Sequence, residues 1–304
     1  MSSLHPIARS RLPSSAVIVG VVVLCRLPSF FRVIFDDDEA QYAAIGALVR
    51  AGGRLYQDGG VDFKPPGIYW TYACVFELAG RYAMWAVHLL ALGVVAATAC
   101  LLARIAERIA TPRAGTLAGV FYGVFTTVYY PKMLAANTEI FMMLGLSAMT
   151  LLVLRARDAS RWLGAMAAAG ALVAIASAYK QSSVANALVI VAGVIGTRRW
   201  FARLAAAGAG CSLALGLGAL VVAATSTLSG MWHWSVTRMI ATHTSNAWQE
   251  GAVWHNVAVG LLPFVASSLV LWIAGLAAAL RCKAWRVAER IVWVWLAISL
   301  LSSF

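Results

Sequence analysis

Charged side chains are scarce in this 304-residue sequence. Aspartate, glutamate, lysine and arginine make up 12% of it, whereas a soluble domain usually has about 25%. Hydrophobic residues make up 62%, and the mean hydropathy is +0.80. One soluble core could not bury that much apolar surface. The scarcity of charge therefore excludes an ordinary soluble enzyme and predicts an all-α, polytopic membrane protein.

Acidic residues are the scarcer charge type, with 12 against 24 basic residues and a net charge of +12. Nucleic-acid-binding proteins gather basic residues on one folded face. Here these residues form short clusters between apolar runs, so we expect no nucleic-acid partner. The five cysteines also lack any Cys-x-x-Cys pair. We predict neither a disulfide framework nor a zinc site from Cys25, Cys74, Cys100, Cys211 and Cys282.

Apolar segments predict about nine transmembrane helices, because roughly 20 apolar residues are needed to cross about 30 Å of hydrocarbon. The segments are 14–31, 82–103, 114–131, 139–154, 162–178, 183–197, 204–225, 257–280 and 291–304. A further apolar segment, 67–79, is too short to span alone. Because the last segment is short and reaches the final residue, we expect a single transmembrane domain, 1–304, that is incomplete at its C-terminus.

Basic residues fall in every second connection between these segments. They are Arg9/Arg11, Arg104/Arg108/Arg113, Arg155/Arg157/Arg161, Arg198/Arg199/Arg203 and Arg281/Lys283/Arg286/Arg290. The positive-inside rule makes that side cytoplasmic, together with the N-terminus. The extracytoplasmic side then holds residues 32–81, 131–138, 179–182 and 226–256. We expect a multi-pass protein of the bacterial cytoplasmic (inner) membrane.

Carboxylates concentrate on the extracytoplasmic side, above all in the first loop, residues 32–81. The loop opens with Asp36-Asp37-Asp38-Glu39, and apolar residues follow at the helical positions Tyr42, Ile45, Gly46 and Val49. This pattern predicts an amphipathic helix on the membrane surface. Asp36 could cap that helix, with Glu39 at its third position. Capping explains one or two carboxylates, but four adjacent negative charges repel one another, so we favour a catalytic role.

The acidic run could supply a general base at the water–lipid boundary, where a lipid-phosphate sugar presents its anomeric carbon. Such a reaction also needs positive charge beside the departing phosphate. Lys64, which follows Asp62-Phe63 and precedes a stiff Pro65-Pro66 pair, suits that task. Alternatively, Lys64 has no role in the reaction, and its side chain extends from the membrane interface so that its ammonium group lies in water.

Two more extracytoplasmic positions could converge on the same place. Glu139 follows Asn137-Thr138 at the mouth of a helix, where an acid is also favourable for the helix itself. Lys180 ends a helix on the side that otherwise avoids basic residues, and either a phosphate or the interface could explain it. Tryptophans and histidines in 226–256 are typical of an aromatic belt, and the histidines lack a metal-ligand spacing.

These motifs resemble the GT-C glycosyltransferases, in particular the protein mannosyltransferase and aminoarabinose transferase group. The resemblance covers residues 15–200 by order and spacing. It is carried by Asp-Asp-Glu-Ala-x-Tyr at 37–42, Tyr-x-Asp at 56–58, Lys-Pro-Pro at 64–66 and Asn-Thr-Glu at 137–139. It implies a GT-C-like fold whose first extracytoplasmic loop carries surface helices and the catalytic motif. It also implies inverting transfer of a sugar from polyprenyl phosphate to a glycan, lipid or protein acceptor.

The resemblance also implies roles for individual residues. Asp38 matches the catalytic aspartate, with Glu39 beside it, and Lys64 matches the lysine near the donor phosphate. We expect Lys180 to bind the donor phosphate too. The other expected site-lining residues are Asp37, Tyr42, Asp62, Asn137 and Glu139. In the aminoarabinose branch a glutamate precedes the lysine; here Phe63 does, which argues against that branch's metal site. A divalent cation on Asp37, Asp38 or Glu39 stays open.

Two other classes compete with a glycosyltransferase. A transporter or lipid flippase would place ionisable residues near the middle of the membrane. The predicted helices carry very few, and the polar residues gather at one interface, so we favour interfacial chemistry. A non-catalytic scaffold would tolerate neutralisation of the acidic run.

Overall fold

The computed structural model describes residues 11–128, 132–242 and 287–301, with single positions 262, 266, 269, 273 and 277. Over these residues the chain is helical and has no strand, only isolated bridges from Leu55 to Gly60 and to Ser226. The elements are α1 (Arg11–Arg26), η1 (Leu27–Phe30), α2 (Asp37–Arg50), α3 (Gly67–Ala79), α4 (Met84–Ile109), α5 (Pro112–Val128), η2 (Lys132–Leu134), α6 (Thr138–Arg157), α7 (Leu163–Ser177), η3 (Gln181–Asn186), α8 (Ala187–Val194), α9 (Trp200–Thr225), α10 (Leu228–Trp232), η4 (His233–Arg238) and α15 (Val287–Leu301). The all-α prediction is confirmed.

The predicted apolar segments coincide with the long helices. The short segment 67–79 matches α3 at both ends. Within the described residues, three helices, α4, α6 and α9, are long and apolar enough to cross a membrane. Shorter apolar helices cover Ser14–Phe30, Leu163–Ser177 and Gln181–Val194. Most of the predicted segment 257–280 lies outside the described residues, and the number nine stays a prediction.

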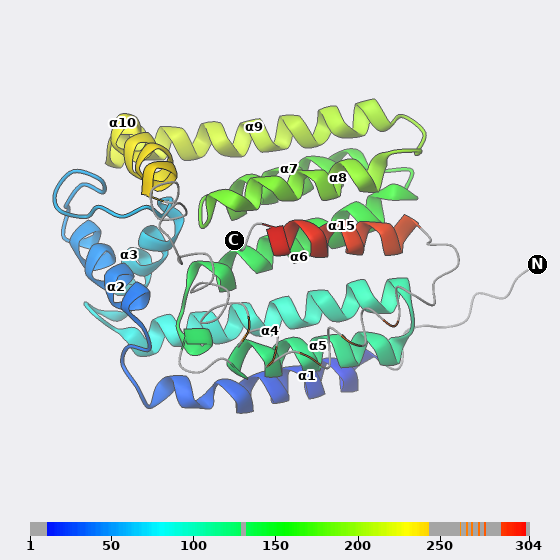
Figure 1. Cartoon of the computed structure of the whole chain (residues 1–304), viewed down its shortest axis with the longest axis horizontal. Helices are drawn as coiled ribbons and strands as arrows, with labels where there is room; N and C mark the ends of the chain where they lie inside the picture. The colour runs from blue at the N-terminus through cyan, green and yellow to red at the C-terminus, as the bar shows by residue number, and fades with distance from the viewer. Residues whose placement is uncertain are drawn as a thin grey trace, which may run out of the picture.

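The long helices run side by side, and the connections between them gather at two opposite ends of the bundle (Figure 1). One end, which we name the loop end, carries α2, α3 and α10. The other end, named the arginine end, carries those of the predicted basic connections that the structure describes. There Arg108 lies 3.9 Å from Asp158, Arg157 donates to the Gly193 carbonyl at 2.6 Å, and Arg203 donates to the Ala156 carbonyl.

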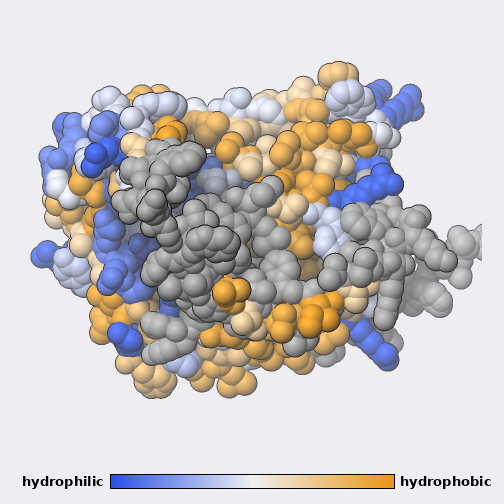
Figure 2. All heavy atoms as spheres, in the orientation of Figure 1, coloured by the Kyte–Doolittle hydropathy of each residue, from blue (hydrophilic) through white to orange (hydrophobic). Residues whose placement is uncertain are grey.

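The surface divides in the same way. Figure 2 shows hydrophobic atoms over the middle of the visible face and hydrophilic atoms toward its two ends. Large apolar side chains are exposed along the helices, for example Leu213, Leu217 and Leu220 on α9 at 66%, 56% and 67%. An apolar belt between polar ends is the surface that a bilayer requires. The chain is a membrane protein.

The predicted amphipathic face of α2 exists, but it packs on α3. Tyr42, Ile45 and Gly46 are buried, and Val49 is half-buried. A Cβ placed on Gly46 would lie 2.6 Å from the Tyr72 Cβ, so only glycine permits this helix crossing. The surface-helix prediction missed this partner. The physical reason is that α3, too short to span the membrane, stays at the loop end and covers the apolar face of α2.

Candidate active site

Asp36 joins the beginnings of two helices that are far apart in the chain. It is the N-cap of α2, with extended backbone, and its Oδ1 accepts a hydrogen bond from Glu39 N at 2.8 Å. This is the cap that the sequence suggested. Its Oδ2 accepts from Nδ2 of Asn137 at 2.8 Å, and Asn137 is the N-cap residue of α6. The acidic run is thereby fixed beside the start of α6.

Glu39 is enclosed in the protein, with 0% of its surface exposed. Its Oε2 accepts from Phe35 N at 2.7 Å, one residue before the position that an ordinary capping box uses. Its Oε1 accepts from Ala136 N at 2.8 Å and lies 3.0 Å from Nε2 of His88. His88 belongs to α4 and is itself buried. Glu39 therefore holds the first turn of α2 against α4 and against the segment that precedes α6.

The Asp38 carboxylate, by contrast, has no side-chain partner among the described residues. It is half-buried, and within the described residues it makes no side-chain hydrogen bond or ion pair. It lies one helical turn before Tyr42 on α2, so the two side chains share a face of the helix. Neighbouring Asp37 is exposed. The two adjacent acids Asp38 and Glu39 thus differ completely in their access to a ligand.

Tyr42 marks the point where the carboxylates converge. Its side chain is fully buried, and its hydroxyl has no hydrogen-bond partner in the described structure. Burial raises the pKa of Tyr42 above its ordinary value, and nearby negative charges raise it further. In order of their effect, those charges are Asp38, Glu139, Asp62 and Asp36. Acids from the first loop and from α6 therefore act electrostatically on one phenol.

The segment before α3 is held firmly from behind. Asp62 accepts from the Tyr69 hydroxyl at 2.5 Å and from Phe63 N at 2.6 Å. The Lys64 carbonyl accepts from the Tyr56 hydroxyl at 2.8 Å and from Ser235 Oγ at 3.1 Å. The Lys64 backbone is thus anchored, while its ammonium group has no hydrogen bond or ion pair among the residues described.

Further anchors come from the ends of α7 and η4. Gln181 Nε2 donates to the Phe63 carbonyl at 2.6 Å and to the Ser235 carbonyl at 2.7 Å. Gly67 N donates to the Ala178 carbonyl at 2.7 Å, and a Cβ on Gly67 would lie 2.5 Å from that oxygen. The beginning of α3 therefore rests directly on the backbone at the end of α7.

Lys180 and Glu139 form an ion pair at the edge of this cluster. Lys180 Nζ lies 2.9 Å from Glu139 Oε1, and their side chains are 27% and 51% exposed. Glu139 Oε2 also accepts from Thr138 Oγ1 at 2.9 Å. Lys180 is thus paired with the Glu139 carboxylate, although a pair this exposed contributes little to stability.

Hydrogen bonds, a ring contact and an ion pair link the groups of this site. Asp36 joins the starts of α2 and α6 through Asn137, and Asp62 bonds Tyr69, whose ring packs on that of Tyr42. Lys180 is joined to Glu139 by its ion pair. Among the described residues, the Lys64 ammonium makes no ion pair with any of these acids. Within the described residues, no group of three or more histidine, cysteine, aspartate or glutamate side chains is arranged to hold a metal ion. Of the predicted aromatic segment 226–256, the histidines and tryptophans in 243–256 lie outside the described residues.

Sequence reasoning assigned no structural role to four residues that build this site, His88, Tyr56, Gln181 and Ser235, although Tyr56 belongs to the Tyr-x-Asp motif at 56–58. His88 had a usable signal, because an ionisable residue inside a membrane-spanning apolar run is by default a candidate for function. The other three act through contacts with the segment 62–67, which is distant in sequence. No local pattern indicates such contacts.

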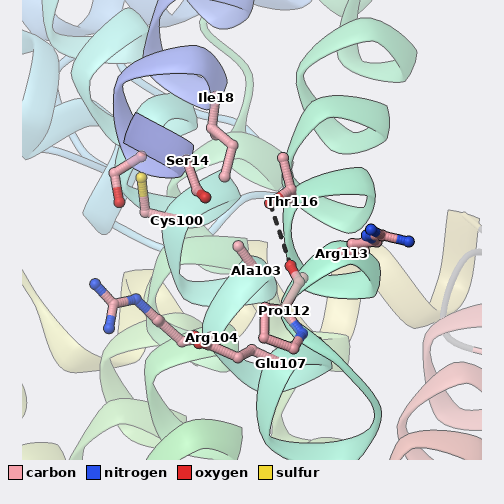
Figure 3. A pocket seen from close by; sticks show the side chains of 11 residues that line it. Ser14, Ile18, Cys100, Ala103, Arg104, Glu107, Pro112, Arg113 and Thr116 are labelled. Carbon is pink, nitrogen blue, oxygen red and sulfur yellow. Dashed lines mark hydrogen bonds between the residues drawn. The ribbon is translucent and has the colours of Figure 1, made fainter. Parts of the chain in front are cut away.

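A cavity of about 160 Å³ lies at the arginine end, between α1, α4 and α5. Figure 3 shows that the guanidinium groups of Arg104 and Arg113, which line it, point in opposite directions. The one acid in its lining is Glu107, and the one hydrogen bond drawn joins Thr116 to Pro112 within α5. The cavity has no convergent set of charged groups and is separate from the carboxylates around Tyr42.

A comparison with known protein families gives a match. A family model described as dolichyl-phosphate-mannose-protein mannosyltransferase matches residues 63–227, which is more than half of the chain. The match begins beside Lys64 and extends just past the end of α9. It does not include Asp36–Glu39. No curated protein and no solved structure matches the chain significantly.

Proposed function

Because the chain belongs to the dolichyl-phosphate-mannose-protein mannosyltransferase family, a GT-C group of glycosyltransferases, we propose that it transfers a sugar from polyprenyl phosphate to an acceptor hydroxyl at the loop end. The observation that carries this proposal is that the Asp36–Asn137 hydrogen bond joins the start of α2, with Asp38, to the start of α6, with Glu139, beside buried Tyr42. Family membership favours this reaction over transport or lipid flipping.

In the proposed reaction the acceptor oxygen attacks the anomeric carbon from the side opposite the phosphate, so the configuration inverts. A new carbon–oxygen bond forms, and the bond between the anomeric carbon and the phosphate oxygen breaks with its electron pair on the phosphate. The acceptor proton passes to the Asp38 carboxylate as general base. Asp38 suits this role because it is half-buried and, within the described residues, unpaired.

Lys64 and Lys180 are the proposed partners of the departing phosphate. A positioned cation stabilises the negative charge that develops on the leaving oxygen. Lys64 is the stronger candidate, because its backbone is anchored and no carboxylate neutralises its ammonium group among the described residues. Lys180 already pairs with Glu139 and would have to share its charge with the phosphate.

Glu39 is proposed as a positioning residue. The sequence suggested that it acts in catalysis beside Asp38, but its two oxygens are enclosed by Phe35 N, Ala136 N and His88. Because both of its oxygens are already bonded within the protein, Glu39 instead fixes the helix turn that carries Asp38. Asn137 has a similar role through Asp36. Asp37 is exposed, and we propose that it lies at the edge of the site.

The two ends of the bundle suggest an orientation. Arginine-bearing connections are favoured on the cytoplasmic side, so we propose that the loop end faces away from the cytoplasm, in a bacterial inner membrane. The acceptor would be a cell-envelope glycan, a lipid or a protein hydroxyl. Comparing glycolipids and glycans from cells with and without the protein would identify it.

Asp38→Asn tests the proposed base directly. We expect it to abolish transfer from polyprenyl-phosphate mannose in membranes while the protein still inserts, because an amide cannot accept the proton. Glu77→Gln is the matched control: it also removes an acid at the loop end, from an exposed pair with Arg50, and should leave transfer unchanged. Wild-type transfer by Asp38→Asn would remove Asp38 from the mechanism.

Lys64→Met tests the proposed phosphate contact. It removes the charge but keeps a long side chain, so the anchored backbone should fold as before. We expect weaker use of the lipid-linked donor, seen as a raised KM for the donor, with little change in thermal stability. If Lys64→Met lowers the melting temperature as well as the activity, Lys64 instead has a structural role.

A further inference from the structure

Tyr42 carries an unexplained polar atom at the centre of the site. A buried tyrosine hydroxyl normally finds a hydrogen-bond partner, and leaving such a group unsatisfied costs about 1–3 kcal/mol. The Tyr42 side chain is 0% exposed, yet its hydroxyl has no partner within the described residues. A phenylalanine would fill the same space without that penalty. The hydroxyl therefore needs an explanation other than packing.

Two neighbouring tyrosines show that the crossing of α2 and α3 can satisfy phenols. The Tyr42 ring packs edge-on against those of Tyr69 and Tyr72, with ring centroids 5.9 and 6.0 Å apart. The Tyr69 hydroxyl donates to Asp62 at 2.5 Å, and that of Tyr72 donates to the Ala136 carbonyl at 3.0 Å. Only the third phenol of this trio is left unpaired.

A second buried polar atom nearby is also unpaired. Asn137 is 7% exposed, and its Nδ2 is committed to Asp36, but its Oδ1 has no partner among the described residues. Asn137 and Tyr42 both border the carboxylate cluster, the first through Asp36 and the second one helical turn from Asp38. The cluster thus contains one unused donor, a phenol, beside several unused acceptors.

The chemistry of these groups restricts what could fill the gap. A phosphate or carboxylate could accept from the phenol, but it would be repelled by Asp38 and Asp62, which have no ion pair within the described residues, unlike Glu139. An ammonium group could donate to the carboxylates but could not accept from the phenol. An alcohol hydroxyl does both, since it accepts one hydrogen bond and donates another.

We infer that the Tyr42 hydroxyl binds a substrate hydroxyl, which in turn donates to Asp38, and that this part of the site selects neutral, hydroxyl-bearing groups over anionic ones. The inference rests on the proposed function. The hydroxyl has two sources with the same chemistry: the sugar of the lipid-linked donor, or the alcohol that accepts the sugar. In both cases Tyr42 is a binding residue that was retained at a cost to stability.

Tyr42→Phe, with Tyr72→Phe as its matched control, tests this inference. In thermal denaturation of the detergent-solubilised full chain, Tyr42→Phe should be as stable as the wild type or more so, because it removes an unsatisfied buried group. Tyr72→Phe should be less stable, because it leaves the Ala136 carbonyl without its donor. A loss of stability in Tyr42→Phe as large as that in Tyr72→Phe would overturn the inference.

Binding and transfer assays distinguish the two sources. With radiolabelled polyprenyl-phosphate mannose as probe, weaker donor binding by Tyr42→Phe, by about tenfold for one lost hydrogen bond, assigns the contact to the sugar. Unchanged donor binding with about tenfold slower transfer assigns it to the acceptor. If both stay at the wild-type level, the inference is wrong.

A further experiment, without the lipid-linked donor, distinguishes a failure of this inference from a failure of the proposed function. If the wild type neither binds nor uses the lipid-linked mannose, the proposed function fails. The hydroxyl site is then judged with methyl mannoside, a neutral polyol, and glucuronate, an anion. The neutral probe should raise the melting temperature of the wild type but not of Tyr42→Phe, and glucuronate should raise neither. Equal shifts in the wild type and Tyr42→Phe, or no shift in either, would overturn the inference.

Discussion

Removing His88 should release the turn that carries Asp38. His88 and Glu39 are 1% and 0% exposed, and their side chains meet at 3.0 Å. Breaking a buried pair costs about 3–5 kcal/mol, whereas a hydrogen bond to a charged group contributes about 1.5–3 kcal/mol. Glu39 keeps two backbone donors after the change, so we expect a cost of about 2–3 kcal/mol in His88→Leu. That corresponds to about 30- to 150-fold more frequent opening of the turn.

Hydrogen exchange measures this opening directly. The amides of Phe35 and Ala136 donate to Glu39, and peptides that contain them should exchange faster by the factor above in His88→Leu. His88→Gln keeps an N–H donor at a similar reach and should restore most of the protection. Thr98→Val is the control: Thr98 is also buried on α4, but its hydroxyl donates to Val94 within the same helix.

Two outcomes would refute this reasoning. Wild-type exchange at both amides in His88→Leu would mean that the backbone donors alone hold Glu39. Faster exchange throughout the bundle, including α7 and α9, would mean that the loss is global and that His88 has no specific effect on the site. Transfer activity should fall in parallel with the local exchange, since the same turn positions Asp38.

Three further predictions concern packing, pH and charge. Gly46→Ala should lower the melting temperature because its new Cβ would collide with Tyr72, at a cost of about 1–3 kcal/mol, whereas Gly93→Ala, at an open position of α4, should not. The pKa values of the buried tyrosines in α2, α3 and the preceding turn are raised, chiefly by burial. The unfolded chain releases these protons near pH 10 and the folded chain does not, so stability should be complete below about pH 10 and fall above it, as a pH series of melting curves would reveal. Lys180→Met should cost less than about 1 kcal/mol, since its pair with Glu139 is partly exposed; a larger drop in melting temperature would contradict this.

Local patterns predicted the helices well because each is encoded by neighbouring residues. Segment 67–79 became α3, and Asp36 caps α2 as expected. Among the described connections, those with the alternating arginines share one end of the bundle; their cytoplasmic placement stays a prediction. These features depend on apolar length, on capping chemistry and on the distribution of charge, and all three can be read within one segment.

The roles of Asp38 and Glu39 could not be separated in the same way. Both are acids in the first turn of one helix, and the difference between them comes from partners far along the chain. His88 lies 49 residues from Glu39, and Ala136 lies 97 residues away. The anchoring of Lys64 by Ser235 spans 171 residues. Contacts at such separations depend on how the helices pack, which periodicity and composition do not specify.

The first loop is fastened to two different sets of helices. Its beginning is held by α4 and by the start of α6, through Glu39 and Asp36. Residues 55–67 are held by the ends of α7, α9 and η4, through Gly67, Ser226 and Ser235. The distance between Asp38, the proposed base, and Lys64, the proposed phosphate ligand, therefore depends on how far apart these helices lie within the membrane. Bilayers whose thickness alters that spacing should change the transfer rate even though neither side chain has been altered, and vesicles made from lipids of graded acyl length would reveal it.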